Sequence, residues 1–169
     1  MPRSSRGMTY AYECIIICHL LAFLANPSPI TYPMNLLSQG AIRMTYFYAI
    51  LAAIVIYMTV GGVWFSKSLF GKEWFKHYGQ PKNMAGSMMG AIINAFIVSC
   101  VLLFFVLHLQ LVTFFDGAIL GFLVWLGFVA TTHFSSVLWA KQPIKLYWIN
   151  QGAFLLSFVL MAGVISVIA

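Results

Sequence analysis

Charged side chains are scarce in this chain. Of its 169 residues, 7% are Asp, Glu, Lys or Arg and 62% are hydrophobic, whereas about a quarter of the residues in a typical soluble domain are charged. So few charged groups cannot cover the chain with a solvated surface. The composition therefore excludes an ordinary soluble globular protein and predicts an integral membrane protein.

Acidic side chains are rarer still, with three Asp and Glu against nine Lys and Arg. The sequence contains no paired carboxylates, no H-E-x-x-H motif, no P-loop, no dinucleotide fingerprint and no nucleophile–base–acid set. We therefore expect no catalytic residue, no cofactor and no metal site. Transport coupled to protons or cations is disfavoured as well, because it usually needs an acid within the membrane.

Cysteine is almost absent, and the three that occur, Cys14, Cys18 and Cys100, form no C-x-x-C motif. Their odd number disfavours a disulfide framework. Cys14 and Cys18 lie one helical turn apart, but no carboxylate or positioned His beside them supports a metal site. We interpret them as small apolar residues.

Long apolar runs are what the chain has in abundance. Four stretches contain no Asp, Glu, Lys or Arg, and each exceeds the roughly 20 residues that a helix needs to cross a bilayer; they are 44–66, 83–115, 117–140 and 146–169. Only helices satisfy their own backbone groups in lipid at this length. We therefore predict an all-α integral membrane fold, a four-transmembrane-helix bundle in the domain 44–169. The predicted spans are 44–66, 84–107, 116–139 and 146–168.

The lysines at the ends of these runs predict the orientation of the chain. Lys67, Lys72, Lys76 and Lys82 follow the first span, and Lys141 and Lys145 follow the third. Because positively charged loops stay in the cytoplasm, we expect both loops there and the C-terminus outside, in a multi-pass membrane protein. The net charge of +6 is attributed to topology and to anionic lipid headgroups, not to nucleic acid.

Residues 1–43 form an N-terminal extension that precedes the first span. Arg3 and Arg6 precede a short apolar run at 14–25, and prolines mark 26–33 as a linker. Three interpretations stay open for the extension: an extra hydrophobic membrane segment, a signal sequence, or an addition outside the working fold.

The stretch GGVWFSKSLFGKEWFKHYG (61–79) places aromatic residues beside lysines after the first span. Its aromatic and charged residues alternate between two faces, which predicts a short amphipathic helix. Trp and Tyr favour the headgroup level, and lysines extend towards water. We therefore expect an interfacial helix that anchors the first two spans, with a gate or docking surface as the alternative. The expected anchors are Trp64, Phe70, Lys72, Trp74, Lys76 and Tyr78.

Within this stretch, VWFSKSLFGKEW (63–74) resembles the W-Y-S-P-x-x-F-G-x-x-W signature of DUF1761, a family of small bacterial four-helix membrane proteins of unknown function. GAILGFLVWLGFVATTHF (117–134) and LYWINQGAFLLSFVLMAG (146–163) add to the resemblance, which covers about residues 44–168. The resemblance implies the four-helix membrane fold, a location in the bacterial inner membrane and no assigned activity. Lys67 stands where the family pattern has Pro, and Ala153-Phe154 replaces a frequent Tyr-His pair, so this chain would lack any chemistry of that pair.

Small and polar residues form a stripe along each predicted span when the helix is projected at about 100° per residue. Small residues let membrane helices approach closely, and polar residues hydrogen-bond across the contact. The packing candidates are Gly86, Gly90, Gly117 and Gly121. The polar candidates, which either line a cavity open to the cytoplasm or only pack, are Asn94, Thr131, Thr132, Asn150 and Ser157.

Two sites near the span ends leave alternatives. His108 and Asp116 flank the turn before the third span and either pair, as in a proton relay or metal site, or leave Asp116 as the cap or first-turn acid of that span. His133 projects opposite the Thr132 face, towards lipid or a neighbouring subunit, and we expect no ligand on it.

Two functions fit this inventory. The first expectation is a structural or accessory membrane protein, an oligomer or a subunit of a larger complex, because ionisable groups are scarce within the spans and glycines line them. The alternative is a small transporter or permeation protein for a neutral or apolar solute, with a cavity lined by Asn94, Thr131, Thr132 and Asn150. An intramembrane enzyme fits least. The expected partners are membrane lipids and further copies of the chain or other membrane subunits.

Overall fold

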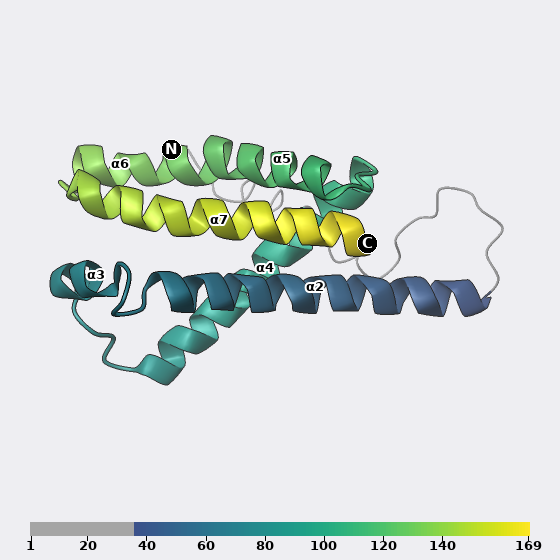
Figure 1. Cartoon of the computed structure of the whole chain (residues 1–169), viewed down its shortest axis with the longest axis horizontal. Helices are drawn as coiled ribbons and strands as arrows, with labels where there is room; N and C mark the ends of the chain where they lie inside the picture. The colour runs from purple at the N-terminus through teal and green to yellow at the C-terminus, as the bar shows by residue number, and fades with distance from the viewer. Residues whose placement is uncertain (1–35) are drawn as a thin grey trace, which may run out of the picture. The chain divides into compact units, whose positions relative to one another are not determined.

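The computed structural model describes residues 36–169, with side chains from residue 43 onward. The regular elements in this part of the chain are all helices (Figure 1). They are α2 (Leu36–Trp64), α3 (Gly71–Tyr78), α4 (Met84–His108), α5 (Phe114–Val124), the π-helix η1 (Trp125–Ala130), α6 (Thr131–Trp139) and α7 (Ile144–Ile168). Cys14, Cys18, the apolar run at 14–25 and the linker at 26–33 lie outside the described residues.

Four of the described helices are long and apolar enough to cross a membrane: Arg43–Trp64, Met84–His108, Phe114–Trp139 and Ile144–Ile168. The third is continuous through α5, η1 and α6. The predicted spans differ from these helices by no more than two residues at any end. The all-α class and the four membrane-capable helices are thus confirmed for this part of the chain.

Polar caps begin two of these helices. The Asn83 side chain accepts a hydrogen bond from the backbone N–H of Gly86 at the start of α4, at 3.0 Å. The Thr113 hydroxyl accepts one from the backbone N–H of Asp116 at the start of α5, at 3.2 Å. Each cap satisfies a helix donor that would otherwise lack a partner.

The closest helix approach is between α5 and α7, which run side by side in Figure 1. A Cβ atom on Gly117 would lie 2.3 Å from the Ala162 carbonyl oxygen, and one on Gly121 would lie 2.3 Å from the Phe158 carbonyl oxygen. Both glycines are buried. No residue with a side chain fits this approach, so the two glycines set the distance between the helices.

The core lies where the second half of α4 crosses α7. Leu102, Leu103 and Val106 of α4 are at most 1% exposed, and they pack in one cluster with Met161 and Ile165 of α7. Ala53 of α2 and Trp125 of η1 belong to the same cluster. All four membrane-capable helices therefore meet in one apolar core.

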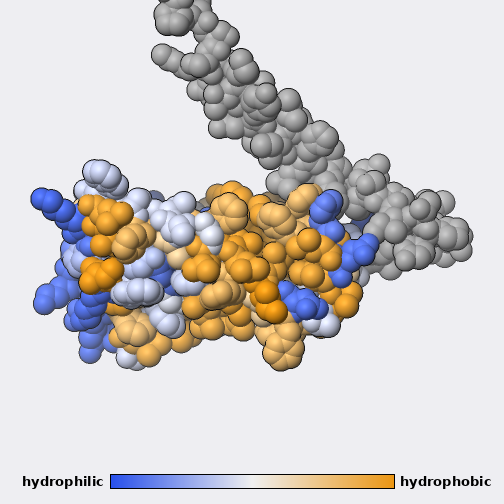
Figure 2. Space-filling model, turned by 90° about the horizontal axis from the view of Figure 1, so that it is seen from above, coloured by the Kyte–Doolittle hydropathy of each residue, from blue (hydrophilic) through white to orange (hydrophobic). Residues whose placement is uncertain are grey.

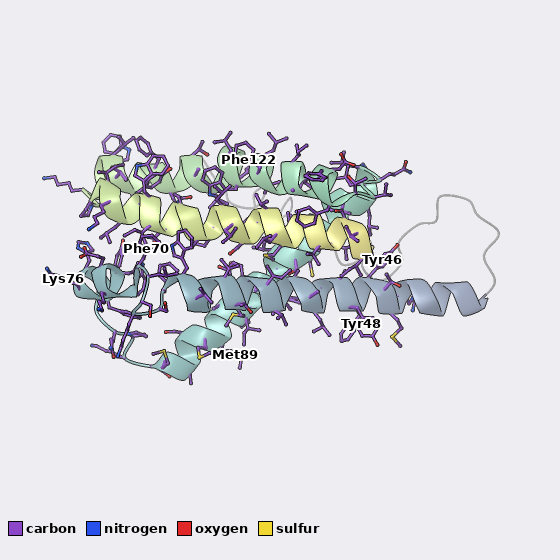
Figure 3. All side chains as sticks on the ribbon, viewed as in Figure 1. Tyr46, Tyr48, Phe70, Lys76, Met89 and Phe122 are labelled. Carbon is purple, nitrogen blue, oxygen red and sulfur yellow. The ribbon has the colours of Figure 1, made fainter. Side chains whose placement is uncertain are left out.

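The first half of α4 and most of α2 lie outside this core. None of the side chains at 84–94 is buried, and Ala49 and Ala53 are the buried residues of α2 among its described side chains. In Figure 1 the first half of α4 diverges from α7, and in Figure 3 Tyr48 and Met89 project away from α7. Figure 2 shows a broad hydrophobic zone between hydrophilic ends. The outer faces of these helices thus offer apolar surface to lipid or to another protein.

Candidate functional site

The first turns of α7 hold the loop and helix that follow α2. The Trp64 indole donates a hydrogen bond from Nε1 to the Ile149 carbonyl oxygen at 2.9 Å. Its ring lies over Gly152, where an added Cβ would come within 2.6 Å of the ring. One turn of α7 therefore supplies both a hydrogen-bond acceptor and a notch for this indole.

A second indole continues the contact. Trp74 Nε1 donates to the Asn150 side-chain oxygen at 3.0 Å, and the Trp74 ring packs against Phe65 and Tyr78, with ring centroids 5.3 and 5.0 Å apart. Asn150 has no hydrogen bond to another polar candidate in the described part of the chain. Its observed role is to receive α3.

The turn between α2 and α3 depends on Gly71. A Cβ there would lie 2.2 Å from the Phe65 carbonyl oxygen, and the Gly71 N–H donates to the Ser66 carbonyl at 2.9 Å. This tight closure requires glycine and brings Trp64 and Trp74 to the same end of α7. The glycine of the signature-like stretch therefore has a structural reason.

Polar side chains complete this junction, which we call the α3 junction: α3, the end of α6 and the start of α7. Gln142 Nε2 donates to the Tyr78 hydroxyl at 2.7 Å, and the Ser136 hydroxyl bonds to Gln142 Oε1. Lys145 Nζ lies 3.1 Å from Glu73 Oε2. The hydrogen bond from Lys145, and then its charge, lower the pKa of Glu73 below its ordinary value.

A π-helix, η1, interrupts the third span between α5 and α6. In η1 the usual backbone pairing is shifted by one residue, and side-chain hydroxyls cover nearby carbonyls. Thr131 Oγ1 donates to the Gly127 carbonyl at 2.6 Å, Thr132 Oγ1 bonds to the Phe128 carbonyl, and the Tyr147 hydroxyl donates to the Ala130 carbonyl at 3.0 Å. Such partners are needed where water is absent. The observed role of the two threonines is therefore to satisfy their own helix.

Beside this segment, Gln151 of α7 meets His133 of α6. Gln151 is 1% exposed, and its Nε2 lies 3.0 Å from His133 Nδ1. The other amide atom, Oε1, is buried without a hydrogen-bond partner, as is Trp125 Nε1, among the residues that the structure describes. A buried polar atom without a partner costs about 1–3 kcal/mol, so these atoms mark the chemically unusual part of the bundle.

The five polar candidates do not form one cluster. Asn94 Nδ2 donates to the Tyr57 hydroxyl of α2 at 2.9 Å, and Ser157 Oγ donates to the Ala153 carbonyl of its own helix at 2.8 Å. Asn150 contacts α3, and the threonines contact their own turn. No hydrogen bond joins any two of the five within residues 43–169.

The four packing glycines divide into two pairs. Gly117 and Gly121 lie against α7, as described above. Gly86 meets its own cap residue Asn83, and a Cβ on Gly90 would have no atom within 4 Å. Neither glycine of the second pair therefore sets a close approach to another described helix, and the expected packing role of this pair concerns a surface that is open here.

At the other end of the bundle, Asp116 is the first-turn acid of α5 and not the partner of His108. Its Oδ2 accepts a hydrogen bond from the Thr113 hydroxyl at 2.6 Å, while the His108 ring stacks on Phe104 with centroids 5.6 Å apart. Of the two alternatives from the sequence, the helix-start interpretation is the one observed. Within the described residues no group of three or more His, Cys, Asp or Glu is placed to hold a metal.

Sequence reasoning missed Gln151, Tyr147 and Trp125. Gln151 could have been identified as a candidate from the sequence, because an amide in an apolar run is costly unless it is hydrogen-bonded. His133 was placed opposite the Thr132 face, towards lipid or another subunit; its ring nitrogen instead meets Gln151, although the residue keeps an exposed side. The π-helix explains the difference, because one added residue in a turn rotates the following side chains by about 100°.

A comparison with known protein families identifies the family of the chain. A family profile described as "Protein of unknown function (DUF1761)" matches residues 48–166, which is more than half of the chain. No curated protein and no solved structure matches the chain. The matched residues include α3, η1 and all of α7 except its last two residues. The chain therefore belongs to the DUF1761 family.

Proposed function

We propose that this chain is a small integral membrane protein of structural or accessory type, which assembles with further copies of itself or with another membrane subunit. The observation that carries the proposal is the first half of α4. Its residues 84–94 have no buried side chain, although the segment contains Gly90, which faces open space, and the amide of Asn94.

Lipid alone cannot satisfy the hydrogen-bonding groups of Asn94. This residue lies ten residues into α4, so it sits about 15 Å along the helix axis, near the middle of a hydrocarbon core of about 30 Å. Its amide makes one hydrogen bond in the described part of the chain, to Tyr57. A helix from another protein surface can approach closely over Gly90 and supply a partner for the remaining amide groups, which lipid cannot do.

The α3 junction supports the accessory role. Two tryptophan hydrogen bonds, Trp64 to Ile149 and Trp74 to Asn150, fix the end of α2 and helix α3 on α7. We place α3 in the cytoplasmic interface of the bacterial inner membrane, with the lysine-bearing loops on the same side and the C-terminus outside. Lys76, labelled in Figure 3, lies at this end of the molecule.

Disulfide cross-linking in membranes tests the proposal. In a chain whose native cysteines are replaced, Gly90→Cys places a thiol on the open stripe, and Gly127→Cys is the control because Gly127 also has no atom within 4 Å of an added Cβ. We expect a cross-linked dimer, or a cross-link to a partner of another mass, for the first variant alone. Monomers from both variants, or equal cross-linking of both, would contradict assembly through α4.

A second candidate is a permeation protein for a neutral solute. The unpartnered Oε1 of Gln151 favours it, since a passing solute would find a polar group inside the bundle. Asn94, Thr131, Thr132 and Asn150 make their hydrogen bonds at separate places, so a cavity lined by all four would need a rearrangement. Replacing Asn94 and Asn150 by Leu separates the two candidates. Loss of solute flux with assembly intact supports permeation, and loss of assembly with no measurable wild-type flux supports the accessory role.

A further inference from the structure

The pair formed by Gln151 and His133 has more hydrogen-bonding capacity than the described residues use. Gln151 is 1% exposed, its Nε2 lies 3.0 Å from His133 Nδ1, and its Oε1 has no partner among the described residues. By contrast, Ser157, which lies two turns further along α7, is also buried and donates to a carbonyl of its own helix. Burial of a polar side chain in α7 thus does not by itself leave that side chain without a partner.

His133 connects this buried amide to the surface of the bundle. The residue is exposed on α6, and its ring packs against Phe154 with centroids 5.5 Å apart. If the Gln151 amide donates to Nδ1, the ring proton resides on Nε2, which is then a second donor. The pair therefore runs from an exposed ring to a buried acceptor.

The chemistry of the open position follows from the amide. With the amide oriented as observed, the open atom is an acceptor; with the oxygen and nitrogen exchanged, it is a donor. A hydroxyl group satisfies either arrangement, because it both donates and accepts.

The charges around Gln151 favour a neutral ligand over an ionic one. The stretches 117–140 and 146–169 contain no Asp, Glu, Lys or Arg. Lys145, in the first turn of α7, is paired with Glu73. An ionic group placed between α6 and α7 would therefore have no unpaired opposite charge within these two helices, at a cost of several kcal/mol. A neutral alcohol carries no such cost, and its alkyl part is compatible with the apolar surface around α6.

We propose that Gln151 and His133 form a binding site for the hydroxyl group of a neutral alcohol or amphiphile that enters from the exposed side of His133. The hydroxyl forms a hydrogen bond with the buried amide atom of Gln151 that has no partner among the described residues. The alkyl part lies along the apolar surface beside Phe154. The π-helix η1 positions this site, because it turns His133 towards α7. The site is independent of the assembly surface on α4.

Photolabelling of the full chain in nanodiscs tests this site. The probe is a diazirine-bearing octanol, and the comparison probe is the matched diazirine-bearing octane without the hydroxyl. We expect the octanol probe to label peptides from α6 and the first half of α7, and excess octanol but not octane to suppress the labelling. Gln151→Met, which keeps the side-chain length, should lower the labelling roughly 3- to 10-fold, as expected for the loss of one hydrogen bond.

The control variant is Ser157→Ala, which removes a buried hydroxyl from the same helix but leaves Gln151 in place; it should label like the wild type. Thermal unfolding of each variant verifies that the fold persists. Equal labelling by the octanol and octane probes would overturn the site, because it would reflect partitioning into lipid. Absence of octanol labelling would also overturn the site, because the hydroxyl-bearing probe would then not bind at Gln151. Unchanged labelling in a folded Gln151→Met protein would exclude Gln151 as the binding group.

Discussion

At the scale of single residues, Gly121 sets how closely α5 approaches α7. An added Cβ would lie 2.3 Å from the Phe158 carbonyl oxygen, so Gly121→Ala must push the helices apart. We expect a loss of about 1–3 kcal/mol in the free energy of unfolding, the usual cost of overpacking. Denaturant titration of the purified protein in detergent, followed by circular dichroism, measures this loss.

The matched control is Gly62→Ala in α2, where an added Cβ has no atom within 4 Å. Alanine favours the helix over glycine by up to about 1 kcal/mol, so this variant should equal or slightly exceed the wild type in stability. Equal destabilisation by both substitutions would show that the α5–α7 approach is not what the glycine protects.

Trp74 provides a second test at this scale. Trp74→Phe keeps an aromatic ring but removes the hydrogen bond to Asn150, so we expect a loss of about 0.5–1.5 kcal/mol in unfolding free energy. The control is Trp148→Phe, since Trp148 is 62% exposed. In a double-mutant cycle with Asn150→Leu, additive losses for Trp74→Phe and Asn150→Leu would contradict a direct interaction between the two side chains.

The residues that sequence reasoning placed well are those whose local signal is strong. Asp116 follows a capping Thr113 by three residues, a spacing that marks a helix start, and it lies there in the structure. Gln151 and His133 are different, because their meeting depends on the π-helix. A projection at a constant angle per residue cannot include that extra residue, since no local sequence signal marks where this π turn begins.

At the scale of elements, α3 is held by a set of weak contacts at the α3 junction. The ion pair between Glu73 and Lys145 lowers the pKa of Glu73, so its contribution is present above the ordinary pKa of a glutamate, about 4.3. The contribution is lost as the pH falls through the lower pKa of the folded state. Because the pair is exposed, we expect a small effect that 1 M salt largely removes.

Hydrogen exchange of residues 71–78 measures this contribution. In the wild type at low salt, exchange corrected for its intrinsic pH dependence should rise as the pH is lowered below about 4. Glu73→Gln should show a flatter acid response, and its exchange at neutral pH should match that of the acidified wild type, because the ion pair is absent from the variant at every pH. An unchanged acid response in the variant would mean that another group controls the docking of α3.

The helices themselves were predictable because the apolar runs are long and their ends carry charges or caps. The short helix at 71–78 was equally readable from its alternating aromatic and charged residues. Its docking was not, because the acceptors that hold Trp64 and Trp74 lie about 80 residues away on α7. Sequence periodicity indicates which face of a helix is distinct, but it does not identify the partner of that face.

At the scale of the whole molecule, the second half of α4 is packed in the core and its first half is not. The four helices meet through Leu102, Leu103 and Val106 of α4, whereas none of the side chains at 84–94 is buried. Because the spans are apolar on nearly all sides, composition alone could not distinguish a lipid-facing surface from one that meets another protein. The open glycine stripe beside Asn94 makes that distinction testable.

The mass of the assembly in native lipid tests the central claim most directly. The chain is extracted from membranes in polymer-bounded lipid discs and measured by native mass spectrometry, together with Gly90→Leu and the control Ala85→Leu, which places the same leucine side chain on another face of α4. We predict two or more chains, or one chain with a stoichiometric partner, for the wild type and the control, and a single chain for Gly90→Leu. A wild-type particle that contains one chain and no other protein would contradict the account.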